Sequence, residues 1–222
     1  WLMENHADEN GKMLNGRETI ELWMALKNYS EQRSLSGNWQ PLGPIIDGVT
    51  TRENIQGVGR VSCIAFHPTN EQIMLVGTPA GGLWKSTNGG ASWSSSTDYL
   101  PTLGISAIAF DPLNPNVVYA GTGDRDAGDS PGMGVLRSDD GGDTWNFINT
   151  GISTRTVGGI IVCADQANSI VIATDLGIRR SIDGGATWTQ ASSNTLEYKD
   201  LAQHPTEPNI LYATGAGRFY RS

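Results

Sequence analysis

Cysteine, histidine and charge are scarce in this chain. Its 222 residues include two cysteines and three histidines, and 17% of them are charged. Two cysteines exclude a disulfide-rich framework, and nothing has the spacing of a zinc site, a Ser-His-Asp site or a phosphate loop. Because Cys63 and Cys163 lie far apart in the repeat pattern described below, we expect two buried free thiols rather than a disulfide.

Long apolar runs and basic patches are also missing. No stretch of about 18 apolar residues occurs, so we expect no insertion into a membrane. The net charge of -8 and the pI of about 4.8 argue against nucleic acid or an anionic membrane as the main partner. The chain begins at Trp1 without a charged-then-apolar signal segment, which fits a processed mature protein and fits equally a boundary that is not the mature N-terminus.

A short signature recurs in the sequence. Its copies are Ser86–Trp93 (STNGGASW), Ser138–Trp145 (SDDGGDTW) and Ser181–Trp188 (SIDGGATW), and Ser222 follows an arginine as in the second and third copies. The serines recur about every 40 to 50 residues, which is the period of one four-stranded propeller blade. The period identifies a repeat protein.

Each residue type in the signature has a structural reason. The Asp or Asn side chain accepts hydrogen bonds from the backbone just ahead, and the glycines supply a positive φ, so the signature closes a hairpin. The tryptophan opens the outgoing strand, where it can be buried against the neighbouring sheet. We expect structural roles for Ser86, Asn88, Gly90, Trp93, Ser138, Asp140, Gly142, Trp145, Ser181, Asp183, Gly185 and Trp188.

Short β-rich runs joined by turn residues surround every copy, which predicts an all-β fold: a β-propeller of four-stranded blades. The expected blades cover about 58–98, 99–150, 151–192 and 193–222, the last one incomplete. A closed propeller has typically four to eight blades, so we expect a longer polypeptide of seven or eight blades whose remaining blades pack on these. Residues 1–57 form a separate lead-in, with a helix expected over 17–33 and an extended segment over 38–44.

The signature resembles the Asp-box, or BNR repeat, of sialidases, sortilin-type receptors and xyloglucan-active endoglucanases. The segments 39–44 (WQPLGP), 59–61 (GRV), 81–86 (GGLWKS) and 121–124 (GTGD) are similar to those of large secreted surface proteins of type IX-secreting bacteria. The resemblance implies a secreted or cell-surface propeller. It does not fix an activity, because one scaffold hosts hydrolases, receptors and binding modules.

Candidate site residues lie in the loops between second and third strands, which the propeller places on the face opposite the signature turns. The longest of these loops holds Asp124, Asp126 and Asp129. Three readings stay open for them: oxygen ligands of a Ca²⁺ ion, recognition of a ligand or partner, or a polar loop whose carboxylates cap its own turns and pair with Arg125.

Asp175 is the other candidate. The run 174–177 (TDLG) is similar to the Thr-Asp-hydrophobic-Gly-Gly segment that holds a catalytic aspartate in the xyloglucan-active enzymes, whereas supporting a tight turn is the alternative role. Those enzymes carry the segment in their first blade, where this chain has Thr78–Gly82 (TPAGG) without a carboxylate. Arg60, Arg125 and Arg179 are too scattered for the arginine cluster of a sialidase.

We therefore name no catalytic residue and no required cofactor, with Ca²⁺ as the one candidate ion. The sequence favours a binding or scaffolding module at the cell exterior, with a protein or glycan as partner. A glycoside hydrolase or carbohydrate-binding propeller is the alternative.

Overall fold

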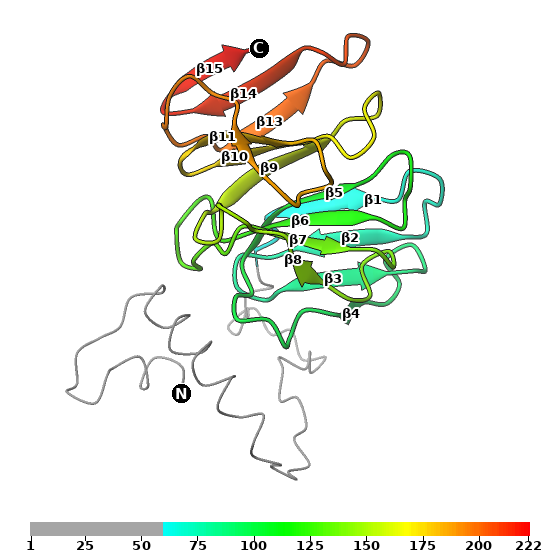
Figure 1. Cartoon of the computed structure of the whole chain (residues 1–222). Coiled ribbons are helices and arrows are strands. Elements are labelled where there is room, and N and C mark those ends of the chain that lie inside the picture. The colour runs from blue at the N-terminus through cyan, green and yellow to red at the C-terminus, as the bar shows by residue number, and fades with distance from the viewer. Residues whose placement is uncertain (1–59) are drawn as a thin grey trace, which may run out of the picture. The chain divides into compact units, whose positions relative to one another are not determined.

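The computed structural model of the chain describes residues 60–222. Four antiparallel sheets follow one another in chain order and stack side by side around a common centre (Figure 1). The predicted partial β-propeller is thereby confirmed. The helix and the extended segment expected over 17–33 and 38–44 lie outside the described residues.

Each sheet is one blade, with its strands in sequence order from the centre outwards. Blade 1 contains β1 (Cys63–Phe66), β2 (Met74–Gly77), β3 (Leu83–Ser86) and β4 (Ser94–Ser95), and blade 2 contains β5 (Ile105–Phe110), β6 (Val118–Thr122), β7 (Val135–Ser138) and β8 (Asn146–Phe147). Blade 3 contains β9 (Val157–Val162), β10 (Ile170–Thr174), β11 (Gly177–Ser181) and β12 (Thr189–Gln190), and blade 4 contains β13 (Asp200–Gln203), β14 (Leu211–Gly215) and β15 (Arg218–Arg221).

The hydrophobic core lies between the blades. Leu75 and Leu83 of blade 1 pack against Val118 and Leu136 of blade 2, and all four are fully buried. A second cluster joins blades 2 and 3 and a smaller one joins blades 3 and 4. The first strands β1, β5, β9 and β13 contact one another in succession, so they line the centre.

The signature turns have the geometry that the sequence predicted. In blade 2, the Ser138 hydroxyl donates to Asp140 Oδ1 at 2.6 Å and accepts the N–H of Gly142 at 2.7 Å. Burial raises the pKa of Asp140, but hydrogen bonds from Ser138 and Thr144 outweigh it and hold that pKa well below its usual range. Gly142 has a φ of 95°, which a residue with a side chain rarely adopts.

The signature turns and the turns between first and second strands share one face. The first signature glycine of each copy donates its N–H to a carbonyl of the adjacent turn, in the pairs Gly89–Gln72 (2.9 Å), Gly141–Asn116 (2.7 Å) and Gly184–Asn168 (2.9 Å). This arrangement places the loops between second and third strands at the opposite face, as expected.

The signature tryptophans are not all buried, which corrects one expectation. Trp145 is 4% exposed and Trp188 is half-buried, but Trp93 is 38% exposed. The indoles of blades 2 and 3 pack backwards onto the preceding blade, and the described residues contain no blade before blade 1. Trp93 therefore has no equivalent surface to cover it within residues 60–222.

Both cysteines are free thiols, as predicted, but they are half-buried rather than buried. Burial raises the pKa of the Cys63 thiol to about 12. That thiol is therefore protonated at neutral pH and unsuited to nucleophilic chemistry.

Candidate functional site

Residues 123–134, here called the long loop, form the longest loop between second and third strands on the face opposite the signature turns. The loop connects β6 to β7 and leaves its strands through Gly123 and Gly134, whose φ angles are 102° and 81°. A Cβ on Gly132 would lie 2.2 Å from the carbonyl oxygen of Arg155. Glycine is therefore needed for the loop to pass this close to the segment that leads into blade 3.

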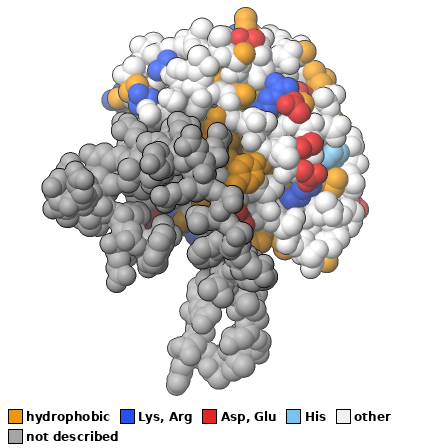
Figure 2. All heavy atoms as spheres, turned by 60° about the horizontal axis from the view of Figure 1, so that its bottom comes forward, with side chains coloured by type: hydrophobic (Ala, Val, Ile, Leu, Met, Phe, Trp, Pro, Cys, Tyr) orange, Lys and Arg blue, Asp and Glu red, His pale blue; other side chains and the backbone are white. Residues whose placement is uncertain are grey.

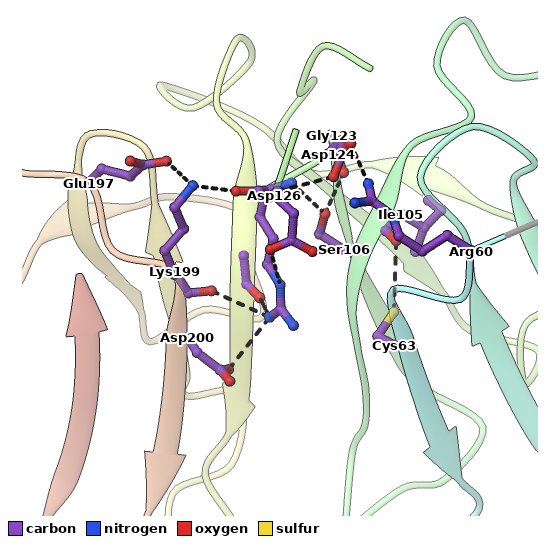
Figure 3. A network of polar contacts seen from close by, with 12 residues as sticks. Arg60, Cys63, Ile105, Ser106, Gly123, Asp124, Asp126, Glu197, Lys199 and Asp200 are labelled. Carbon is purple, nitrogen blue, oxygen red and sulfur yellow. Dashed lines mark hydrogen bonds and ion pairs between the residues drawn. The ribbon is translucent and has the colours of Figure 1, made fainter. Parts of the chain in front are cut away.

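Asp124 is buried and anchors the long loop to blade 1. Its side chain is fully buried, and Oδ2 accepts a hydrogen bond from Arg60 at 2.5 Å (Figure 3). Its Oδ1 accepts the N–H of Asp126 at 3.0 Å. Burial raises the pKa of Asp124, but the backbone N–H groups of Asp126 and Ala127 and the Arg60 guanidinium together lower it below its usual value. This carboxylate stays charged because its partners replace water.

Arg125 anchors the same loop to the other three blades. Its N–H donates to the Ser106 hydroxyl of β5 at 3.1 Å, and Nη1 donates to the carbonyl of Gly158 in β9 at 2.6 Å. The same Nη1 lies 3.4 Å from the carbonyl oxygen of Lys199 and 3.8 Å from Asp200 Oδ1, at the start of β13. One guanidinium thus contacts the inner strands of blades 3 and 4.

The three contact positions are equivalent in their blades. In blades 2, 3 and 4, one residue of the first strand pairs with the next-to-last residue of the second strand. The position just before that residue is held by Ser106, Gly158 and Lys199, respectively. Ser62 is the matching residue of blade 1, and its Oγ is buried without a hydrogen-bond partner within the described part of the chain. The Asp124–Arg125 pair therefore sits where the four inner strands converge.

Lys199 completes this central network. Its ammonium donates to the carbonyl of Arg125 and lies 2.7 Å from Glu197 Oε1 (Figure 3). The side chains of Glu197 and Asp200 are 50% and 61% exposed, so both carboxylates remain open to solvent beside the long loop. These contacts tie the long loop to blades 3 and 4, while the carboxylates of Glu197 and Asp200 face water.

The three predicted carboxylates of the long loop do not converge. Asp124 points into its ion pair with Arg60, Asp126 is exposed with Oδ1 3.8 Å from Arg125 Nε, and Asp129 is exposed. Within residues 60–222, no group of three His, Cys, Asp or Glu side chains is placed to hold a metal ion. The turn capping and the pairing with Arg125 agree with the third reading of this loop.

Asp175 lies on the tight turn between β10 and β11, on the same face. Its N–H donates to the carbonyl of Thr156 at 3.1 Å, and Oδ1 lies 3.8 Å from Arg155 Nη1. The turn is closed by the Thr174 hydroxyl, which donates to the carbonyl of Gly177 at 2.7 Å. The side chain of Asp175 is 30% exposed, although its Oδ1 is buried.

Sequence reasoning missed the connecting roles of Arg60, Arg125 and Lys199. Arg60 lies 64 residues from its partner Asp124, and Lys199 lies 74 residues from Arg125. The one signal in the sequence is the repeat register, which aligns Ser62, Ser106, Gly158 and Lys199 as one ring of positions.

Charged side chains on the surface lie in small mixed groups. On the face drawn in Figure 2, acidic and basic side chains neighbour one another in small groups. The described residues include no helix with the length and hydropathy of a membrane span.

Known proteins with similar sequences are xyloglucanases. No family model matches the chain. A xyloglucanase of Hypocrea jecorina (strain QM6a) is 34% identical over 128 residues, which are 52% of this chain and 15% of that protein. A xyloglucanase of Paenibacillus sp is 32% identical over 95 residues, or 40% of this chain and 9% of that protein.

Solved structures give the same fold. An ancestral GH74 enzyme aligns with a TM-score of 0.56 and 26% identity, over 73% of this chain and 25% of that one. The GH74 xyloglucanase of Xanthomonas campestris aligns with a TM-score of 0.57 and 18% identity, over 72% and 28%. These relatives are carbohydrate-active propellers. The chain spans less than a third of the length of each of these four proteins.

Proposed function

We propose that this chain is part of an exported glycoside hydrolase-like propeller that binds a neutral polysaccharide of the xyloglucan type on the face of the long loop. The observation that carries the proposal is the sequence identity to proteins named xyloglucanase, over a stretch that covers half of this chain. The net charge of -8 also supports a neutral glycan over a polyanionic one, because an acidic protein repels a polyanion.

Three solvent-accessible carboxylates are proposed to contact sugar hydroxyls: Asp126, Asp129 and Asp175. An ionised carboxylate accepts up to four hydrogen bonds, which suits vicinal hydroxyl groups. Asp124 takes no part in the contact, since its carboxylate is buried in the Arg60 ion pair. It positions the loop instead.

Binding without cleavage by these blades is the second candidate, and one observation favours it. Cleavage of a glycosidic bond needs two carboxyl groups, one on each side of the bond. Thr78–Gly82 in blade 1, where the resemblance places a catalytic aspartate, has no carboxylate. Under this reading the chain contributes glycan or protein binding to a larger molecule, as first expected from the sequence.

The export of the protein and its assignment to the Asp-box repeat belong to the same proposal. The turn geometry of the signatures supports the Asp-box assignment. Secretion through a type IX system, and a kinship with sortilin-type receptors, rest on the sequence resemblance alone. The extracellular domain of a B. thetaiotaomicron one component system shares the fold, with a TM-score of 0.53 and 17% identity.

Affinity electrophoresis through gels containing xyloglucan tests the proposal, with reducing-end release measured on the same samples. We expect the chain to be retarded by xyloglucan. The double variant Asp126→Asn with Asp129→Asn should be retarded less, and Asp165→Asn, an exposed carboxylate on the opposite face, should behave as the unmodified chain. Retardation with release of reducing ends supports a hydrolase and retardation alone supports a binding module. Absence of retardation would overturn both.

A further inference from the structure

One backbone hydrogen bond recurs where the chain passes from each blade to the next. A glycine in the loop between second and third strands donates its N–H to a carbonyl of the segment that leads into the following blade. The pairs are Gly82–Leu103 (2.9 Å), Gly134–Arg155 (3.0 Å) and Gly177–Leu196 (2.9 Å). Because this bond uses a main-chain carbonyl, it does not depend on the side chain, and leucine holds the position before blades 2 and 4. Arg155, before blade 3, departs from the repeat.

Asp175 departs from the repeat at a neighbouring position. The threonine near the end of each of the first three second strands closes the loop by donating its hydroxyl to a glycine carbonyl. The pairs are Thr78–Gly82 (3.0 Å), Thr122–Gly134 (2.8 Å) and Thr174–Gly177 (2.7 Å). The residue after the threonine is Pro79 in blade 1 and Gly123 in blade 2, whereas blade 3 has Asp175. Closing the loop therefore requires no carboxylate at this position.

These two departures lie next to each other in the structure. Arg155 Nη1 is 3.8 Å from Asp175 Oδ1, and the two side chains are 27% and 30% exposed. An ion pair this accessible to water adds little to the stability of a fold. A charged pair that replaces residues sufficient in the other blades indicates a role beyond folding.

The backbone around Arg155 also contacts the long loop. A Cβ on Gly132 would lie 2.4 Å from the Cα of Thr156, and a Cβ on Gly123 would lie 2.8 Å from Thr156 Oγ1. On its other side, the carbonyl of Thr156 accepts the N–H of Asp175 at 3.1 Å. The segment 155–156 therefore lies between the long loop of blade 2 and the Asp175 turn of blade 3, and it contacts both.

We propose that Arg155 is a positioning residue of the glycan-binding face: its guanidinium directs the Asp175 carboxylate, so that Asp175 and the long loop contact the same glycan. The glycan as ligand rests on the function proposed above. Arg155 acts through Asp175 and does not contact the sugar. A carboxylate that is oriented before the ligand arrives loses less side-chain entropy on binding, which raises the affinity.

Two substitutions separate the charge of Arg155 from its packing. Arg155→Met keeps an apolar stem without the charge, whereas Arg155→Lys keeps the charge, and a single contact at 3.8 Å does not need the fork of a guanidinium. Affinity electrophoresis at graded xyloglucan concentrations gives a dissociation constant for each variant. We expect Arg155→Met to raise it about three- to tenfold and Arg155→Lys to stay within about twofold of the unmodified chain. Equal values for the two variants would contradict a role of the charge.

The same substitution in a chain that carries Asp175→Asn tests whether Arg155 acts through Asp175. Asp175→Asn alone should raise the dissociation constant about tenfold, because a hydrogen bond to a charged group is lost. Adding Arg155→Met should then raise it no further. A further rise of about threefold or more would mean that Arg155 contacts the glycan itself or supports another part of the fold, and the positioning role would be wrong.

The control is Leu103→Met, which places the same side chain at the equivalent position before blade 2 and should leave the dissociation constant unchanged. Amide exchange in residues 123–134 should also be unchanged in Arg155→Met, because main-chain contacts hold the loop there; faster exchange would point to a structural role instead. If the unmodified chain is retarded by xyloglucan and Arg155→Met binds equally well, the positioning role fails and glycan binding stands. If the unmodified chain is not retarded at all, both fail.

Discussion

Replacing Asp124 by asparagine should loosen the long loop and destabilise the fold by about 2 to 3 kcal/mol. The Asp124 side chain is fully buried and accepts hydrogen bonds from Arg60 and from the N–H of Asp126. Hydrogen bonds to a charged group contribute roughly 1.5 to 3 kcal/mol, and breaking a buried ion pair costs roughly 3 to 5 kcal/mol. We take the lower part of these ranges, because the Arg60 side chain is 43% exposed and regains water when its partner is lost.

The pH dependence has a defined sign. The folded state lowers the pKa of Asp124, so its contribution is fully present above the unfolded pKa of about 3.9 and is lost as the pH falls through the folded value. Urea unfolding at a series of pH values should therefore show the penalty of Asp124→Asn shrinking below about pH 4. The matched control is Asp129→Asn, an exposed position on the same loop, which should stay within about 0.5 kcal/mol. The reasoning would be refuted if Asp124→Asn lowered the free energy of unfolding by less than about 0.5 kcal/mol at neutral pH, or if the loss of stability were the same in acid.

Three further outcomes follow from the contacts. In urea unfolding, Trp145→Ala should lower the free energy of unfolding by about 3 to 5 kcal/mol and Trp93→Ala by only roughly 1 to 2 kcal/mol, because the first indole is 4% exposed and the second 38%. Equal losses of stability would contradict the assignment of the indoles to the surfaces between blades. Arg125→Ala should speed amide exchange in residues 123–134 about tenfold or more, since it removes hydrogen bonds to Gly158 and Lys199, whereas the exposed Arg218→Ala should leave that exchange unchanged. Calorimetric titration should find a Ca²⁺ dissociation constant no lower than millimolar. Because Asp124 is engaged in its ion pair with Arg60, only Asp126 and Asp129 remain as carboxylate ligands in the loop. Micromolar binding would instead support the loop as a calcium site.

The repeat made the architecture predictable from the sequence. Glycine pairs, Asp or Asn and tryptophan at fixed spacing determine local turns, so the blades and the two faces follow from short-range chemistry. The exposure of Trp93 was missed because it depends on whether a neighbouring blade covers that side of blade 1, and a local sequence pattern does not describe this. The contacts of Arg125 were missed for a related reason. A long, glycine-rich loop can fold in many directions, and only the converging inner strands determine that its guanidinium meets Gly158 and Lys199.

The site is less predictable than the fold. The sequence singled out the long loop as a candidate site and grouped Asp124 with Asp126 and Asp129, whereas the structure separates a buried anchor from two exposed carboxylates. Spacing along a chain does not reveal which carboxylate turns inwards. Asp124 is the buried one because it forms the ion pair with Arg60, at the start of blade 1.

NMR chemical-shift mapping with a xyloglucan oligosaccharide tests the central claim most directly. If this propeller face binds a glycan, the shifts should concentrate in the loops between second and third strands: residues 78–82, 122–134, 174–177 and 214–217. The signature turns on the opposite face should remain unperturbed. Shifts confined to the signature turns, or none at millimolar oligosaccharide, would contradict the account.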